Sequence, residues 1–218
     1  MPTEPTTSSF ALLGLLAIRP WAAYDLAHQA KRSMRLFWPR SEAHIYAEVK
    51  RLVRWEYATS TTERTGNRSR TTYAITPVGR EALRAWLATP PAGPQLEIEG
   101  LLRLLLADQG EKADALEAVR ATRESVVETG TVAVKQFRAY LDGGGPFPER
   151  AHLVVLLARF YGAFAETMLD WCDAAEAEIS GWPDVHGGGL SDDSRRALGA
   201  MIERFERRMA PAHTNRVE

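Results

Sequence analysis

The chain lacks the sequence features of secreted and membrane proteins. Its 218 residues include a single cysteine, Cys172, which excludes an internal disulfide framework and is typical of a reducing compartment. No charged segment followed by an apolar run stands where a signal peptide would, and the uninterrupted apolar runs are too short to cross a bilayer. We therefore expect a cytoplasmic protein with no membrane partner.

Motifs for catalysis and for cofactors are missing as well. The five histidines are scattered, and no two of them stand at the spacing of metal ligands. No glycine-rich loop of a nucleotide-binding or dinucleotide-binding type occurs. Cys172 stands between Trp171 and Asp173 in a helical pattern, which predicts a buried structural thiol rather than a nucleophile. We predict that the protein is not an enzyme and that it needs no cofactor and no metal.

The net charge of −1 hides a strong asymmetry along the chain. Residues 9–88 hold thirteen basic and six acidic side chains, a net charge of +7, and the remainder carries −8. A basic part joined to an acidic part indicates that only the first part meets a polyanion.

The order of elements in the first part is that of a winged helix-turn-helix, in which the third helix enters the major groove and a β-hairpin forms the wing. The linker Thr89-Pro90-Pro91-Ala92-Gly93-Pro94 then separates a DNA-binding domain, residues 1–90, from a second domain, residues 91–218. The predicted elements are helices at 9–19, at 21–33 and from 41 to about 54, strands at 57–62 and 70–75 around a tip at 63–69, and a helix over 77–87 that Thr76 caps.

The helix that begins at Ser41 is the candidate recognition helix. Ser41 is a good N-cap, and Ile45, Val49 and Leu52 recur at steps of four and three, so that one face points into a core. The opposite side of this helix carries His44, Tyr46, Lys50 and Arg51. Taken alone, an ordinary amphipathic surface helix explains this pattern equally well, but the neighbouring elements favour a DNA-reading helix.

Three arginines, Arg64, Arg68 and Arg70, surround the expected tip of the wing. They favour phosphate or minor-groove contacts over a merely solvated loop. Lys50, Arg51, Arg64 and Arg68 are expected on phosphates, and Tyr46, His44 and Arg70 on bases or sugars. The predicted DNA-binding set is Ser41, His44, Tyr46, Lys50, Arg51, Arg64, Arg68 and Arg70.

The second part predicts helices alone, so that the whole chain is mainly α. The expected helices cover 96–107, 112–141 and 149–180, with a last one that Ser191 caps. The helix over 149–180 carries apolar residues at heptad-like spacing, which suits helix-against-helix packing. Such a stripe on few helices favours a homodimer; the alternative is that the stripes fold onto the chain's own first helix.

The first 90 residues contain several ordered motifs of one family: Ala11-Leu12-Leu13-Gly14-Leu15-Leu16, Tyr24-Asp25-Leu26, Phe37-Trp38-Pro39, the run from Ile45 to Leu52, and the run from Tyr73 to Leu83. In these motifs the chain resembles the PadR family of bacterial transcriptional regulators. The resemblance implies a homodimeric DNA-binding regulator, usually a repressor of a nearby operon, that binds a pseudo-palindromic operator. Some members release DNA when they bind a small aromatic or hydrophobic molecule. Tyr46 and Lys50 match the family's recognition helix, and Arg68 and Arg70 match its basic wing.

Two departures from the family pattern stand out. Ala22-Ala23 replaces a His-Gly or similar pair, and Trp55-Glu56-Tyr57 stands where a glycine usually ends the recognition helix. If Glu56 takes a left-handed conformation, it costs about 1 kcal/mol relative to glycine.

Aromatic residues suggest an effector chamber at the dimer interface. Trp86, Phe160, Phe164, Trp171 and Trp182 are candidates to line an apolar chamber for a flat ligand, and plain core packing is the alternative. A winged helix that binds protein, or that senses a ligand without sequence-specific DNA binding, is the competing function.

Overall fold

The computed structural model describes the backbone of residues 4–65, 68–187 and 189–210, and the side chains of all of these except 65 and 68. The chain divides into two compact units, Met1–Gln95 and Leu96–Glu218. The fold is mainly helical with one small antiparallel sheet, as the sequence predicts.

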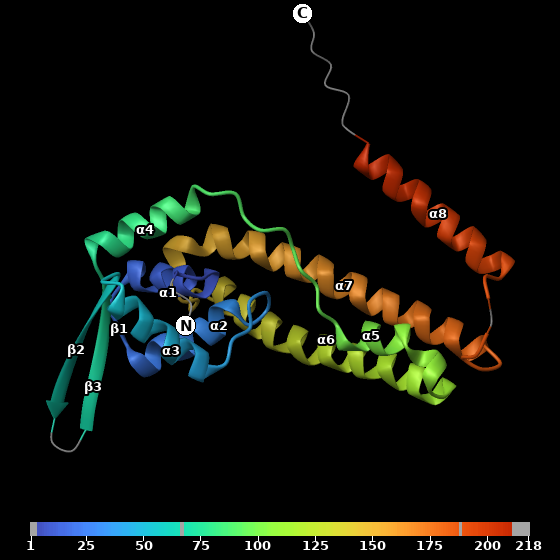
Figure 1. Cartoon of the computed structure of the whole chain (residues 1–218), viewed down its shortest axis with the longest axis horizontal. Coiled ribbons are helices and arrows are strands. Elements are labelled where there is room, and N and C mark those ends of the chain that lie inside the picture. The colour runs from blue at the N-terminus through green and yellow to red at the C-terminus, as the bar shows by residue number, and fades with distance from the viewer. Residues whose placement is uncertain (1–3, 66–67, 188, 211–218) are drawn as a thin grey trace, which may run out of the picture. The chain divides into compact units, whose positions relative to one another are not determined.

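The first unit has the predicted order of three helices, a hairpin and a further helix (Figure 1). Its sheet has the strand order β1-β3-β2, and every pairing in it is antiparallel. The elements are α1 (Thr7–Ile18), β1 (Trp21–Ala22), α2 (Ala23–Met34), α3 (Glu42–Arg54), β2 (Ala58–Thr65), β3 (Arg68–Ile75) and α4 (Pro77–Leu87).

Helix α1 begins earlier than the sequence suggests. Ser9 is not the N-cap; Thr6 is, and the two residues form a reciprocal capping box in which each side chain accepts from the other's backbone N–H. The helix then buries Leu12, Leu13 and Leu16 almost completely.

The segment Trp21–Ala22 was expected in a helix and instead forms strand β1, which pairs with β3 through Trp21 and Tyr73. Pro20 keeps the chain extended at this point, and an aromatic side chain suits a half-buried sheet edge. Trp21 is buried, and its indole N–H donates to the Leu15 carbonyl at 2.9 Å. A third strand therefore stands beside the predicted two-stranded wing.

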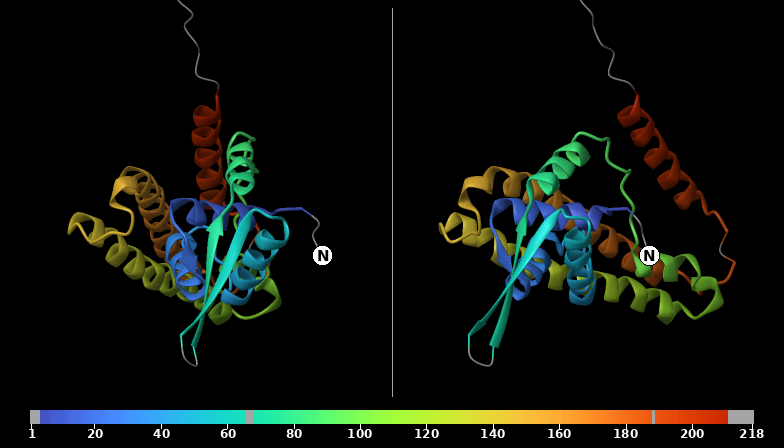
Figure 2. Two further views of the ribbon diagram at one scale, coloured as in Figure 1. Left: turned by 90° about the vertical axis from the view of Figure 1, so that its left-hand side faces the viewer. Right: turned by 60° about the vertical axis from the view of Figure 1, so that its left-hand side comes forward.

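The hairpin is longer than the predicted one. Its register runs from Ala58 opposite Ile75 to Thr65 opposite Arg68. The expected tip of residues 63–69 is therefore mostly paired strand, in which the opposite charges of Glu63 and Arg70 face each other across the two strands. Figure 2 shows the two strands extending away from the helices of their unit.

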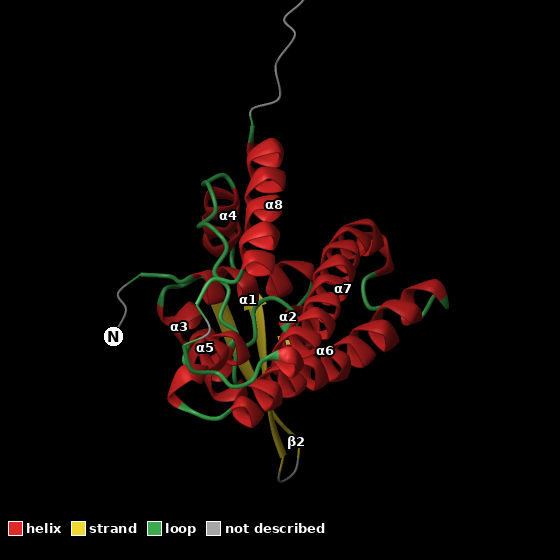
Figure 3. Cartoon of the chain, turned by 90° about the vertical axis from the view of Figure 1, so that its right-hand side faces the viewer, coloured by secondary structure: helices red, strands yellow, loops and turns green. Residues whose placement is uncertain are grey.

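The second unit contains no strand among its described residues, and Figure 3 shows every strand of the described chain in the one small sheet of the first unit. Helix α6 has the predicted bounds, and Ser191 caps α8 as expected by accepting from the Ser194 N–H. The helices are α5 (Glu99–Leu105), α6 (Lys112–Leu141), α7 (Ala151–Gly181) and α8 (Asp192–Met209), with short 3-10 turns at Ala107–Gln109 and Pro148–Arg150.

Helices α6 and α7 run side by side in opposite directions (Figure 1). Ala115 and Val119 of α6 pack against Cys172 and Ile179 of α7 in a buried cluster. The Arg120 guanidinium of α6 also donates to Glu176 of α7 at 2.8 Å. The pair is thus held by a small apolar core and a charged rim.

Much of the apolar surface of α7 is exposed. Leu156 and Phe160 expose 62% and 69% of their surface, respectively. The stretch Pro148–Gly181 is long and apolar enough to cross a membrane by length and composition alone, although the sequence was expected to hold no such run. Arg159 and Glu166 interrupt it, which hides it from a search for unbroken apolar runs. A single helix of this kind is weak evidence of a membrane span.

Candidate nucleic-acid interface

Helix α3 has one buried and one accessible side. Ser41 caps it by accepting from the His44 N–H at 3.2 Å, as the sequence predicts. Ile45, Val49 and Leu52 are buried against α1 and α2, which confirms the predicted core face. The cap and the core face together fix which side of the helix a ligand can meet.

Two of the predicted contact residues lie on the accessible side. Lys50 is exposed and Tyr46 is half-buried. They are one helical turn apart, so that their side chains stand next to each other. An ammonium group beside a phenol offers a charge for phosphate and a hydroxyl for a base or sugar.

The end of α3 determines how the wing leaves it. Glu56 has a φ of 60°, which is the left-handed conformation that glycine usually adopts at this position. The Glu56 N–H donates to Val53 and the Tyr57 N–H to Leu52, which closes the helix in a Schellman motif. The Thr76 hydroxyl then donates to the Glu56 carbonyl at 2.7 Å. The non-glycine residue is thus held at the joint between α3 and the hairpin.

The arginines of the wing differ in their surroundings. Arg64 is exposed in β2. Arg70 is exposed in β3 and donates to Asp25 of α2 at 3.3 Å, so the wing is linked to the second helix. Arg68 opens β3, but its side chain lies outside the described residues. The backbone therefore presents Arg64 and Arg70 from neighbouring strands.

His44 and Arg51 both lie close to the carboxylate of Glu48. The Arg51 guanidinium donates to the Glu48 carboxylate, and His44 Nε2 lies 4.0 Å from the same carboxylate. Glu48 itself is completely buried. Sequence reasoning overlooked Glu48, although its position, three residues after Ile45 and four before Leu52, places it on the inward face.

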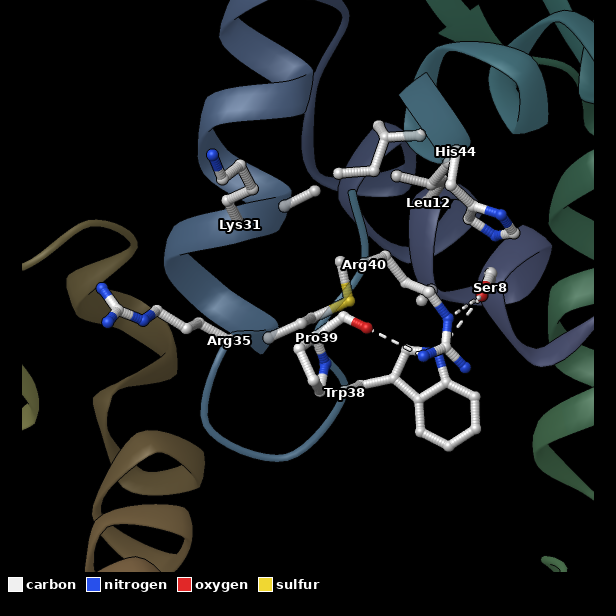
Figure 4. Close-up of a pocket in the computed structure, with 12 residues that line it drawn as sticks. Ser8, Leu12, Lys31, Arg35, Trp38, Pro39, Arg40 and His44 are labelled. Carbon is white, nitrogen blue, oxygen red and sulfur yellow. Dashed lines mark hydrogen bonds between the residues drawn. The ribbon is translucent and has the colours of Figure 1, made fainter. Parts of the chain in front are cut away.

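A pocket of about 300 Å³ lies beside the start of α3 (Figure 4). Leu12, Ala30, Met34 and Ile45 give it apolar walls. Basic side chains stand around it: Lys31, Arg35 and Arg40. The shape and lining suit a small molecule with an apolar body and a negative charge.

One corner of the pocket is organised around Ser8. The Trp38 indole N–H and the Arg40 Nε both donate to the Ser8 hydroxyl, at 3.2 and 3.3 Å. The Arg40 guanidinium also lies over the Trp38 ring, 4.5 Å from its centroid. Lys31 is paired with Glu42 at 2.9 Å, whereas no acid pairs with Arg35 or Arg40 among the described residues.

The five aromatic candidates for an effector chamber lie elsewhere, and none of them lines this pocket. Trp86 belongs to the first unit and stacks on Phe10 with 5.0 Å between the ring centroids. Trp171 packs against the buried cluster of α6 and α7, and Phe164 is half-buried. Phe160 and Trp182 are exposed. Core packing therefore accounts for Trp86 and Trp171.

The described part of the chain contains neither a metal cluster nor a reactive thiol. No three histidine, cysteine or acidic side chains gather there as a metal site would require. Cys172 is fully buried, as predicted, and burial raises the pKa of its thiol in spite of the nearby Arg123. A buried thiol with a raised pKa is a poor nucleophile.

Comparison with known proteins gives a family match over part of the first unit and a shared fold over most of the chain. Residues 12–85 match the sequence model of the Transcriptional regulator PadR-like family. No curated protein matches the chain at a significant level.

Solved structures share the fold of most of the chain. Bacillus subtilis PadR in complex with operator DNA matches with a TM-score of 0.66 and 19% identity, over 80% of this chain and 99% of that one. The same protein in complex with p-coumaric acid matches at 0.61 and 19%, over 79% and 98%. The Vibrio cholerae virulence activator AphA matches at 0.60 and 21%, over 80% and 98%.

Proposed function

We propose that the chain is a transcriptional regulator of the PadR-like family, whose model matches residues 12–85, and not an enzyme, and that it binds operator DNA as a homodimer and represses a nearby operon. Helix α3 enters the major groove, and the β2–β3 hairpin follows the backbone beside it. The observation that carries this proposal is the accessible Tyr46 and Lys50 side of a helix whose other side is buried. A protein of the same fold is known with operator DNA.

The contacts divide into two kinds. Lys50, Arg64 and Arg68 neutralise phosphates, whereas Tyr46 and Arg70 meet bases or sugars. Ser41 stands at the N-cap of α3, where the positive end of the helix dipole favours a phosphate, and His44 in the same turn is a further candidate for a base or sugar contact. The predicted phosphate contact of Arg51 needs the guanidinium to serve Glu48 and DNA together.

Gel-shift titration over a series of salt concentrations tests this assignment. The probes are a duplex from upstream of the chain's own coding sequence and a random duplex. Lys50→Ala should weaken binding to both and lower the slope of log K against log salt by about one unit. The matched control is Lys135→Ala, which removes an exposed lysine from α6.

Tyr46→Phe tests the base or sugar contact. If the hydroxyl bonds DNA, its loss should weaken operator binding by about 1 kcal/mol. An unaltered slope in Lys50→Ala, together with full affinity in Tyr46→Phe, would contradict the interface. Absence of binding to either duplex at any salt concentration would favour the alternative, a winged helix that binds protein.

The homodimer is proposed from the apolar surface of the second unit. Leu156 and Phe160 of α7 and Phe205 of α8 are exposed, which is unusual for large apolar side chains in a monomer. A two-fold dimer presents two copies of α3 to half-sites about one helical turn apart, or a multiple of it. Five extra base pairs between the half-sites should therefore abolish high-affinity binding, and ten should restore it.

We further propose that a small effector molecule binds the protein and releases it from the DNA. Bacillus subtilis PadR is known in complex with p-coumaric acid, an aromatic acid. The pocket beside Trp38 combines apolar walls with Arg35 and Arg40, a suitable lining for a molecule of this class. The chamber of Trp86, Phe160, Phe164, Trp171 and Trp182 remains the alternative site.

Tryptophan fluorescence with p-coumaric acid as the probe separates the two sites. Binding to the pocket should be lost in Arg40→Ala and kept in Phe160→Ala, and the reverse pattern would favour the aromatic chamber. Whether the bound protein represses or activates is read from a reporter gene behind the operator. The virulence activator AphA has the same fold, so activation is the competing outcome.

A further inference from the structure

Helix α3 buries an acid in the middle of its apolar face. Its inward row is Ile45, Glu48, Val49 and Leu52, with steps of three, one and three residues. These four residues are buried, and Glu48 has no exposed surface at all. A carboxylate in such a place must be neutralised by partners, because its burial is otherwise strongly unfavourable.

The partners of Glu48 come from two helices. The Ser9 hydroxyl of α1 donates to one carboxylate oxygen, and the Arg51 guanidinium donates to the other. Ser9 also accepts from the Thr6 N–H at 2.8 Å, as part of the capping box of α1. One hydroxyl therefore joins the start of α1 to the centre of α3. We call Ser9, Glu48 and Arg51 the buried link.

The buried link is expected to contribute little to the free energy of folding. A buried ion pair gains little over apolar side chains of similar volume, because both charges lose their hydration. An apolar residue at position 48 would complete the row of Ile45, Val49 and Leu52. Two other ion pairs of the first unit, Lys31–Glu42 and Arg70–Asp25, have both side chains at least half exposed. Directional bonds are what the buried link adds to the core.

The rotation of α3 about its own axis determines where Tyr46 and Lys50 point. Tyr46 and Lys50 stand two residues before and after Glu48, so both point about 160° away from it. A rotation of α3 by about 20° would move a side-chain end about 6 Å from the axis by about 2 Å, which breaks a hydrogen bond to DNA. Apolar contacts alone are non-directional and tolerate such a rotation better.

We propose that Glu48 is a positioning residue for sequence-specific DNA recognition. Through Ser9 it fixes the rotation of α3 against α1, and Arg51 serves as its counter-ion rather than as a phosphate contact. Glu48 does not touch DNA. This inference rests on the proposed function, since it names what sets the specificity of the same helix.

The test compares an apolar replacement of the buried link with the wild-type chain. The variant is Ser9→Ala/Glu48→Leu/Arg51→Met, and the probe is a duplex that the wild-type chain selects from a random-sequence pool. Affinity for this duplex and for a random duplex gives a specificity ratio. Failure of the wild-type chain to select any sequence would overturn the proposed function itself, so the two failures are distinguishable.

The expected result is a folded variant with an unchanged or raised melting temperature, whose specificity ratio falls at least tenfold. Its salt slope should equal that of wild type, because no phosphate contact is removed. A stable variant that keeps the full ratio would overturn the proposal. A slope that falls by about one unit would overturn the role given to Arg51.

Two single variants keep the proposal testable if the triple variant does not fold. Ser9→Ala removes the bond to Glu48 together with the capping box of α1. Thr6→Ala is its matched control, because it removes the Thr6 hydroxyl from the box and leaves the Ser9–Glu48 bond in place. The specificity ratio should fall in Ser9→Ala and stay near wild type in Thr6→Ala. Equal ratios in these two variants would contradict the proposal.

Discussion

The two units of this chain bury their apolar residues to very different degrees. In the first unit the large side chains of three helices and the sheet are buried together, among them Leu13, Leu26 and Leu52. In the second unit the buried cluster consists mainly of small residues such as Ala115 and Cys172, while Leu156 and Phe160 are exposed. The first unit is thus a complete fold, whereas the second leaves an apolar face to be covered.

This difference is consistent with the roles proposed for the two units. A complete core holds a surface in a fixed shape, which suits the reading of DNA. An incomplete core gains from a second copy of itself, which suits assembly. Four substitutions test this difference between the units.

The largest effect is expected from Leu52→Ala. Leu52 is fully buried in α3, and the cavity left behind should reduce the free energy of unfolding of the first unit by about 2–5 kcal/mol. Leu87→Ala, which removes an exposed side chain of α4, should cost less than about 0.5 kcal/mol. Hydrogen exchange should show faster exchange in α1–α3 and unchanged protection in α6 and α7. Equal loss of protection in α6 and α7 would show that the units unfold together.

Phe160→Asp should act on assembly instead. A charge on the apolar face of α7 should weaken dimerisation by about 2 kcal/mol or more, roughly 30-fold, as seen by sedimentation over a concentration series. Glu166→Ala, at an exposed position of the same helix, is the control. The melting temperature of the first unit should not change. If the wild-type chain is monomeric, or if Phe160→Asp leaves the dimer unchanged, the apolar face of α7 is not an assembly surface.

Glu56→Gly should stabilise the first unit. The residue has a φ of 60°, where a side chain is strained and glycine is not, so the gain should be about 0.5–1 kcal/mol in urea unfolding. Glu56→Ala keeps a Cβ and should show no such gain. If both variants behave alike, the left-handed conformation is not the cause.

The smallest effect concerns the charged rim of α6 and α7. The hydrogen bond from Arg120 lowers the pKa of Glu176 below its ordinary value. A lowered folded-state pKa means that the charged carboxylate stabilises the fold above about pH 4.3, its unfolded value, and that this contribution is lost as the pH falls further. Glu176→Gln should therefore lower the melting temperature slightly at pH 7 and not near pH 3. The difference at pH 7 should shrink in high salt, since the pair is partly exposed.

Local patterns in the sequence predicted most of the fold. The serine before α3, the Thr76-Pro77 start of α4 and the spacing of Ile45, Val49 and Leu52 are short-range signals, and the structure confirms them. Strand β1 was missed because a two-residue strand depends on pairing with β3, which lies about fifty residues away in the chain. Long-range pairing leaves no periodic pattern in so short a segment.

The candidate site was predicted less completely. Composition and spacing placed Tyr46 and Lys50 on the side of α3 opposite its core face, and the structure confirms this placement. They did not reveal that the Arg51 guanidinium donates to Glu48. The burial of that carboxylate depends on packing against α1, where Ser9 is its second partner, and local sequence does not show this packing. The pocket beside Trp38 likewise combines residues of α1, α2 and α3, so no single motif contains it.

The third strand also bears on the thermodynamics of DNA binding. Because β3 is paired with β1 on one side and β2 on the other, the base of the hairpin is ordered before any DNA is present. Arg70 and Asp25 add a second tie between the same strand and α2. A wing ordered in advance loses little conformational entropy when it settles on the backbone, so the loss on binding falls mainly on side chains. Preorganisation of this kind raises affinity without any additional contact.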